Sequence, residues 1–162
     1  MNLHKILCPT DFSPHTEAAL SYASALAAES GATLIIAHVD EYRDASAALG
    51  EAALVYIDPL GIEDRSEVRQ KLEAVRPTNS RVVYEHRYLE GGPIHEIVSF
   101  AEREHVDLIV MGSHGRTGLA RLLMGSVAEG VTRRATCPVL IVKQPMPAES
   151  SDLPDESLVL QE

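Results

Sequence analysis

The chain has 162 residues, of which 45% are hydrophobic and 23% are charged. This length corresponds to about one domain, and such a domain buries enough apolar surface to fold without disulfides or metal. Its apolar runs are far shorter than the roughly 20 residues that a membrane-spanning helix needs. Residues 1–6 enter a strand-like run without the features of a signal peptide, so we expect a cytoplasmic protein.

Fourteen basic residues stand against 24 acidic ones, which gives a net charge of −10. This balance disfavours nucleic acid and anionic membrane surfaces as partners. Half of the charge lies in residues 145–162, which contain no Lys or Arg and are predicted to be an acidic, disordered tail. The preceding residues, 1–144, form one predicted domain. A small anionic ligand can still bind that domain through converging backbone N–H groups.

Residues 3–8 are the first predicted strand, which ends before a loop at Pro9. A helix is predicted to begin at Ser13 and Pro14, because an oxygen-bearing cap followed by proline is typical of a helix start. Gly31 supplies the positive φ that commonly ends a helix.

The nearly continuous apolar run 32–39 predicts a strand covered on both faces. The pattern weakens over residues 40–77, where 45–53 and 63–76 are each compatible with a helix.

Residues 81–88 regain strand character, and Gly91-Gly92-Pro93 opens another predicted helix. A buried strand follows over 107–111. Ser126-Val127-Ala128-Glu129 is read as a capping box that starts the last helix, and 138–143 is a final apolar strand.

This alternation predicts an α/β fold, a three-layer open parallel five-stranded sheet with helices on both faces. Ligands of such sheets bind beyond the carboxyl ends of the strands, where the strand order reverses. The ends in question are residues 8–11, 39–40 and 111–115. Cys8 ends its strand whereas Cys137 precedes its own, so both are expected to remain reduced.

The segment most informative about chemistry is 112–126, where small residues lead from a strand back to a helix start. Free N–H groups and the positive end of a helix favour phosphate at such a place. Gly112 and Gly115 let the backbone approach a ligand closely, and Arg116 and Ser126 offer donors to phosphate.

Two common nucleotide signatures are absent, because the chain contains no Walker A sequence and its glycine spacing differs from G-x-G-x-x-G. On spacing alone, a turn without a ligand remains the alternative. Seven histidines without a recognisable metal-binding spacing give no reason to predict a transition-metal site.

The pattern Gly112-x2-Gly115-x9-Gly125-Ser126 resembles the nucleotide-binding pattern of ATP-binding universal stress proteins. Pro9-Thr10-Asp11, Leu89-Glu90-Gly91 and the closing stretch 137–142 are similar to landmarks of the same family. The resemblance covers roughly residues 1–143 and is weakest between 41 and 80.

The resemblance implies a strand order of 3-2-1-4-5, with ATP (or AMP or ADP) between the first and fourth strands and Mg²⁺ accompanying the nucleotide. It places the following residues around the adenosine: Pro9, Thr10, Asp11, Val39, Met111 and Gly112. It places these in or beside the phosphate loop: Ser113, His114, Gly115, Arg116, Gly125, Ser126 and Val127. Asp11 is read either as a ribose or metal-linked contact or as a turn residue, and His114 either as a phosphate contact or as an exposed loop side chain.

Hydrolysis of ATP requires a positioned water and stabilisation of the transferring phosphoryl group. Arg116 can supply charge, but no water-positioning base is evident in the sequence, so we predict no catalytic residues and a nucleotide-dependent stress regulator with slow or no turnover. The alternatives are a phosphoacceptor signalling domain that uses Asp11 and Lys143, and an interaction module that binds no nucleotide.

The last predicted strand, Pro138 to Lys143, is uncharged until its final residue. An edge strand of this kind invites association, and the family resemblance also implies a two-fold dimer through this edge. We therefore predict a homodimer.

Overall fold

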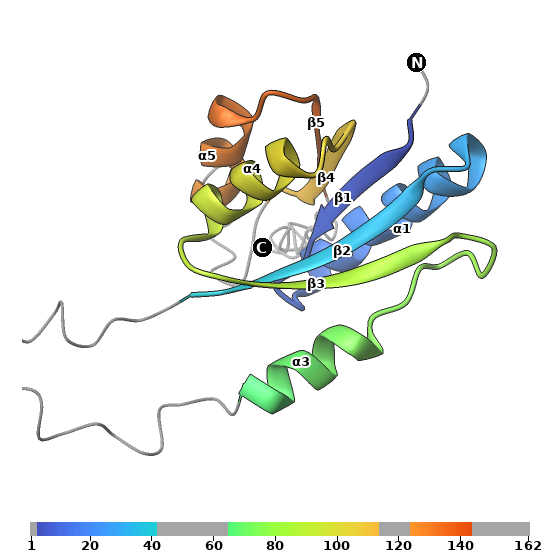
Figure 1. The fold of residues 1–162 in the computed structure, drawn as a ribbon, viewed down its shortest axis with the longest axis horizontal. Coiled ribbons are helices and arrows are strands. Elements are labelled where there is room, and N and C mark those ends of the chain that lie inside the picture. The colour runs from blue at the N-terminus through green and yellow to red at the C-terminus, as the bar shows by residue number, and fades with distance from the viewer. Residues whose placement is uncertain (1–2, 42–64, 114–123, 144–162) are drawn as a thin grey trace, which may run out of the picture.

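The computed structural model describes residues 3–41, 65–113 and 124–143 (Figure 1). Strands and helices alternate along these residues: β1 (Lys5–Pro9), α1 (Pro14–Ser30), β2 (Thr33–Asp40), α3 (Arg65–Ala74), β3 (Tyr84–Glu90), α4 (Pro93–Arg103), β4 (Leu108–Gly112), α5 (Ser126–Arg134) and β5 (Val139–Val142). The five predicted strands are confirmed. The predicted helix over 45–53 and the predicted tail lie outside the described residues.

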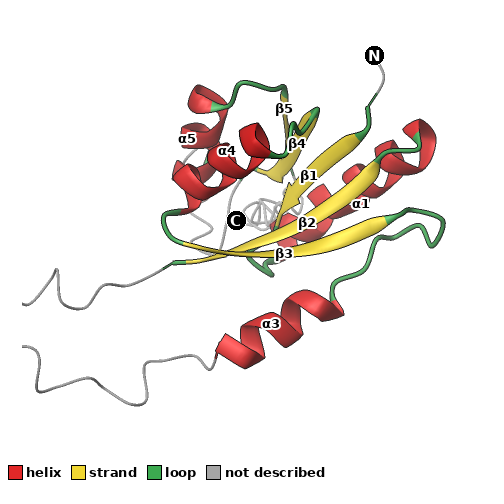
Figure 2. Cartoon of the chain, in the orientation of Figure 1, coloured by secondary structure: helices red, strands yellow, loops and turns green. Residues whose placement is uncertain are grey.

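The five strands form one sheet in the order β3-β2-β1-β4-β5, and every neighbouring pair is parallel (Figure 2). β1 and β2 are aligned with Lys5 opposite Thr33, and β4 and β5 with Ile109 opposite Val139. The predicted fold class and strand order are therefore confirmed.

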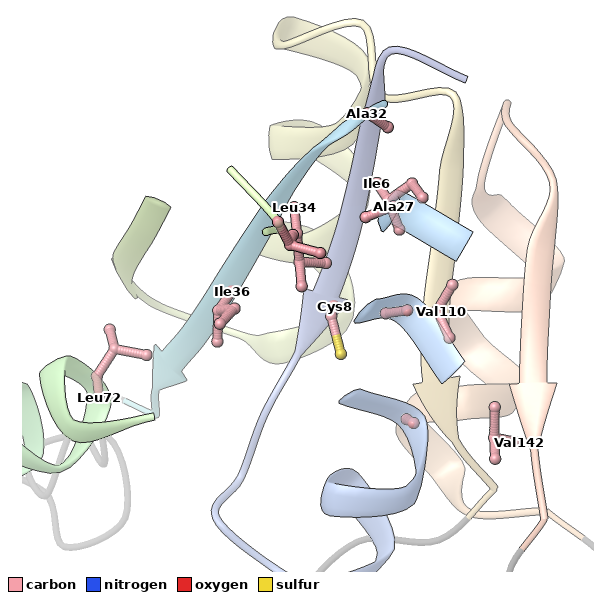
Figure 3. Packing of buried hydrophobic residues seen from close by; sticks show 12 residues of the cluster. Ile6, Cys8, Ala27, Ala32, Leu34, Ile36, Leu72, Val110 and Val142 are labelled. Atoms are coloured by element: carbon pink, nitrogen blue, oxygen red, sulfur yellow. The ribbon is translucent and has the colours of Figure 1, made fainter. Parts of the chain in front are cut away.

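Two apolar layers sandwich the sheet because successive strand residues point to opposite faces. On one face, Ile6 and Cys8 of β1 pack with Leu34 and Ile36 of β2 (Figure 3). That face is covered by α1 and α3. The residues α1 contributes to this layer are small, chiefly Ala19, Ala23 and Ala27, so the helix lies close to the strands.

The opposite face carries the alternate residues of the same strands, including Leu7, Ile35 and Ile109. They pack against α4 and α5, which lie side by side on this face (Figure 1). Ile97 and Phe100 are buried residues of α4 in this second layer. The core is therefore divided by the sheet into two apolar clusters, one for each pair of helices.

The start and end of α1 agree with the sequence prediction. Ser13 is the N-cap in extended conformation, Pro14 is the first helical residue, and Gly31 ends the helix with φ of 73°. The Ser13 hydroxyl, however, does not cap the helix, and this buried oxygen has no hydrogen-bond partner within the described part of the chain.

The predicted capping box at the start of α5 is wrong. Gly125 is the N-cap, and Ser126 is already the first helical residue, with no side-chain cap. The Gly125 N–H donates to the carbonyl oxygen of Ser113 at 2.7 Å, and the Glu129 N–H donates to the Gly125 carbonyl at 2.9 Å. α5 therefore begins one residue earlier than predicted, because the hydrogen bond to Ser113, just after β4, fixes the position of Gly125.

Both cysteines are free thiols, as predicted, with Cys8 buried and Cys137 partly exposed. Burial raises the pKa of the Cys8 thiol to about 12. Among residues 3–41, 65–113 and 124–143, no helix combines the length and apolar character that a bilayer crossing requires.

Candidate functional site

The neighbouring strands β1 and β4 pair over a short distance only, through Ile6 with Leu108 and Leu7 with Ile109. Beyond this point β1 continues along β2 as far as Pro9, and β4 continues along β5 as far as Gly112. The pairing of β1 with β4 therefore stops before the carboxyl ends of the two strands. This is also where the strand order reverses, and open parallel sheets bind ligands in such a crevice.

Three of the predicted adenosine residues lie on one face of the sheet, at this end of the strands. Val39 and Met111 belong to the apolar layer beneath α4 and α5. Pro9 follows Cys8, which faces α1, so the alternation of strand residues places Pro9 on the α4 and α5 face as well. The structure therefore gathers these three residues around the mouth of the crevice.

The residues after β1 form a loop that is held by its own hydrogen bonds. Thr10 Oγ1 accepts the N–H of Phe12 at 3.1 Å, and Asp11 Oδ1 accepts the N–H of Ser13 at 3.0 Å. The Thr10 hydroxyl also lies 3.1 Å from that of Thr16 in α1. Asp11 therefore acts as a turn residue, one of the two roles predicted for it from the sequence, in the loop that follows β1.

The end of β4 is joined directly to the start of α5. Ser113 donates its N–H to the carbonyl of Val142 at 2.9 Å and accepts the N–H of Gly125 at 2.7 Å. The two ends of the glycine-bearing loop therefore meet, and Ser126 and Val127 open α5 at the end of β4. The first N–H groups of a helix have no partner inside it, and they form its positive end. The predicted residues His114, Gly115 and Arg116 lie outside the described residues.

A cleft of about 520 Å³ is lined by residues from the start of α4 and from both ends of α5. Sites for small molecules usually measure about 300–1,000 Å³, so this cleft has a suitable size. The described residues that line it are Glu41, Gly92, Pro93, Ile94, His95, Ser126, Val127 and Arg134.

Ser126 and Val127 of this lining are among the predicted phosphate residues, whereas none of the others, most of which lie at the start of α4, was predicted as a site residue. A signal for them was present, since Gly91-Gly92-Pro93 marks a helix that begins at the carboxyl end of a strand. Gly91 has φ of 138° and donates its N–H to the carbonyl of Asp40 at 3.0 Å. This bond ties the start of α4 to the end of β2.

A polar cluster supports the same end of the sheet on the side of α3. The Tyr88 hydroxyl donates to Asp40 Oδ2 at 2.5 Å, and the Arg69 guanidinium lies 3.9 Å from the centre of the Tyr88 ring. Burial and then the hydrogen bond to Asp40 raise the pKa of Tyr88 to about 12. Its phenol is therefore neutral at ordinary pH and acts here as a hydrogen-bond donor.

Comparison with known proteins agrees with this architecture. Residues 2–143 match the model of the universal stress protein family. Universal stress protein MJ0531 of Methanocaldococcus jannaschii is 39% identical over 145 residues, which cover 89% of this chain and 85% of the relative.

Two solved structures extend the comparison to three dimensions. That of MJ0577, from the same organism, has 35% identity and a TM-score of 0.66, and the match covers 91% of this chain and 100% of that one. A universal stress protein in complex with cAMP has 28% identity and a TM-score of 0.56, with coverage of 88% and 98%. By the extent of the family match and the identity of these relatives, the chain belongs to the universal stress protein family.

Proposed function

We propose that this protein is a stress-response regulator that binds an adenine nucleotide in the crevice between β1 and β4. One observation carries the proposal: the pairing of β1 with β4 ends early, at Leu7 and Ile109, next to the start of α5. The hydrogen bond from Gly125 to Ser113 holds that helix start at the end of β4. The cAMP complex of a related universal stress protein supports the same class of ligand.

In this arrangement the nucleoside lies at the end of β1, β2 and β4. Pro9, Val39 and Met111 offer it apolar contacts, while Thr10, Asp11 and Gly112 border the sugar. The phosphates extend toward α5, whose first N–H groups and positive end favour an anion.

The phosphate end combines described and undescribed residues. Ser126 is the first residue of α5, so its hydroxyl belongs to the helix start that would face the phosphates. His114, Gly115 and Arg116 complete the phosphate loop on the sequence pattern alone. Mg²⁺ would bind chiefly through phosphate oxygens and water, because this ion keeps much of its hydration shell.

The site is suited to holding a nucleotide with slow or no hydrolysis. Asp11, in the loop that follows β1, uses Oδ1 to accept the Ser13 N–H. The Tyr88 phenol, with its pKa raised to about 12, is not a base at neutral pH. Fast turnover requires a group that orients the attacking water. Asp11 is engaged in holding its own loop, and the Tyr88 phenol lies on the α3 side of the sheet.

The proposal includes a homodimer. β5 lies at the edge of the sheet, and its Leu140 side chain is 37% exposed. An edge strand with exposed apolar residues is suited to pairing with a second copy.

Nucleotide binding is tested by denaturing the purified protein, identifying any released nucleotide by mass, and measuring the affinity of the emptied protein for ATP and AMP by calorimetry. Ser126→Ala is expected to weaken ATP binding by roughly fivefold to tenfold and AMP binding less, since one hydrogen bond to a charged group is lost. Thr132→Ala is the matched control, because it removes a hydroxyl from the same helix that bonds to the Ala128 carbonyl.

Absence of released nucleotide together with no binding of ATP or AMP at millimolar concentration would refute the proposal. Covalent labelling of the protein by acetyl phosphate in that case would identify the phosphoacceptor alternative.

A further inference from the structure

His38 lies in β2 directly before Val39, yet its side chain is on the other face of the sheet. It follows Leu34 and Ile36 in the alternation and is 5% exposed, whereas Val39 faces α4 and α5. A ligand that touches Val39 is therefore separated from the imidazole by the sheet itself. Any influence of His38 on such a ligand must pass through the residues that His38 contacts.

The imidazole contacts the backbone of the loop after β1. His38 Nδ1 lies 2.7 Å from the carbonyl oxygen of Thr10. A carbonyl oxygen only accepts, so Nδ1 carries the hydrogen in this bond. The N–H of Thr10 in turn donates to the carbonyl of Ala37 at 2.7 Å. Two consecutive residues of β2 thus hold both polar groups of the Thr10 backbone.

The same imidazole contacts the loop again two residues later. Phe12 has φ of 64°, a left-handed conformation that is unfavourable for a bulky residue. Its ring stacks on His38, with the ring centres 4.4 Å apart and the planes at 29°. Asp11 lies between these two contacts, so its backbone position is fixed from both sides by one buried side chain.

We propose that His38 is a positioning residue for the nucleotide site, one that sets the Thr10–Asp11 edge of the adenosine end from behind the sheet. The inference rests on the proposed function and adds a residue that does not touch the ligand. Because the action of His38 is confined to the adenosine end, loss of the bond from His38 to Thr10 weakens the binding of AMP and the binding of ATP by the same factor. Loss of the Ser126 hydroxyl, at the phosphate end, weakens ATP more than AMP.

The test compares two substitutions of His38. In His38→Asn the side-chain amide nitrogen takes the place of Nδ1 and can still donate to Thr10. In His38→Leu the side chain retains bulk but has no donor. We expect His38→Leu to weaken AMP and ATP equally, by roughly tenfold, and His38→Asn to remain within about threefold of the unaltered protein. Thermal unfolding without ligand, measured on the same samples, separates lost stability from lost affinity.

Equal affinities in the unaltered protein and His38→Leu would overturn the inference, and so would equal losses in both variants. If the unaltered protein binds neither nucleotide, the proposed function fails instead, so the two failures are distinguishable. A measurement on the unaltered protein covers the case in which His38→Leu does not fold. The ¹⁵N spectrum of the histidine rings should show His38 with its hydrogen on Nδ1, and a neutral ring with its only hydrogen on Nε2 would overturn the inference.

Discussion

Gly130 in α5 lies directly against the side chain of Ile94 in α4. A Cβ atom at residue 130 would stand 2.9 Å from Ile94 Cγ1 and closer still to Cδ1, a separation that real Cβ atoms do not adopt. The absence of a side chain at Gly130 therefore allows the two helices to approach closely. Ile94 and Ser126 both line the cleft that lies beside these two helices.

Gly130→Ala is expected to lower the free energy of unfolding by about 1–3 kcal/mol, as overpacking of a buried contact does. The sign of this change is informative, because at an exposed position in a helix alanine is more stabilising than glycine by about 1 kcal/mol. Urea denaturation measures the change.

The matched background is Ile94→Val, which removes the Cδ1 atom that the new methyl group would meet. There the cost of Gly130→Ala should shrink. If Gly130→Ala alone is as stable as the unaltered protein, α4 and α5 move apart without cost and the prediction is contradicted.

Local signals account for the features that were predicted correctly. Pro14 and Gly31 set the limits of α1 through their own backbone preferences, and those limits were found. The strand predicted from the apolar run 32–39 differs by one residue at each end from β2, which spans Thr33–Asp40. These features depend on residues adjacent in the chain.

Tertiary contacts and specific turn bonds explain the errors in the element boundaries. Ser126 has the composition of a cap, but the bond between Gly125 and the distant Ser113 determines where α5 begins. Residues 81–83 look like a strand, yet Asn79 Oδ1 accepts the Arg81 N–H at 3.0 Å and bends the chain before β3 starts at Tyr84.

The candidate site divides in the same way. The family resemblance named Pro9, Val39 and Met111, and all three lie at or just after the ends of predicted strands, which meet at a common edge in a parallel sheet. The contact of His38 with Thr10 depends on how β1 and β2 are aligned, which the sequence of either strand does not specify. The cleft wall on α4 likewise depends on how closely two helices pack.

Asp107 joins the start of β4 to the start of β1. Its Oδ2 accepts the N–H groups of Lys5 at 2.9 Å and His4 at 2.7 Å, and these bonds hold the pKa of the carboxyl below its ordinary value of 3.8. Because the folded pKa is lowered, the carboxylate stabilises the protein above the ordinary value, and this contribution is lost as the pH falls through the lowered one.

Asp107→Asn should therefore lower the free energy of unfolding at pH 7 by about 1–2 kcal/mol, the scale of a hydrogen bond to a charged group. The difference from the unaltered protein should narrow as the solution is acidified below pH 4. Urea titrations across this range measure it, and a difference that stays constant with pH would contradict the assignment.

The Tyr88 hydroxyl is the donor to Asp40, and the pKa of this phenol is raised to about 12, first by burial and then by that bond. A raised folded pKa means that the contribution to stability is complete below the ordinary value of 10 and is lost as the pH rises toward 12. Ultraviolet titration should show one tyrosine that ionises late, and Tyr88→Phe should remove that step.

Tyr22→Phe, at a residue that is 59% exposed, is the control that leaves the late step in place. Alkaline unfolding gives the second readout. The stability of the unaltered protein should fall more steeply above pH 10 than that of Tyr88→Phe. A late step that survives in Tyr88→Phe would show that another tyrosine carries it.

Leu140 provides the test of the proposed homodimer, since it is 37% exposed on the edge strand β5. Leu140→Lys places a charge where a second copy would bury an apolar side chain, and desolvating that charge opposes association. We expect the unaltered protein to be a dimer at micromolar concentration and the variant to be a monomer, as measured by light scattering after gel filtration.

Val83→Lys is the control, because Val83 is 69% exposed and lies just before β3, on the opposite edge of the sheet. The Val83→Lys protein should therefore remain a dimer. A monomeric unaltered protein would refute the dimer, and equal dissociation of both variants would show that added charge, rather than the β5 edge, controls assembly.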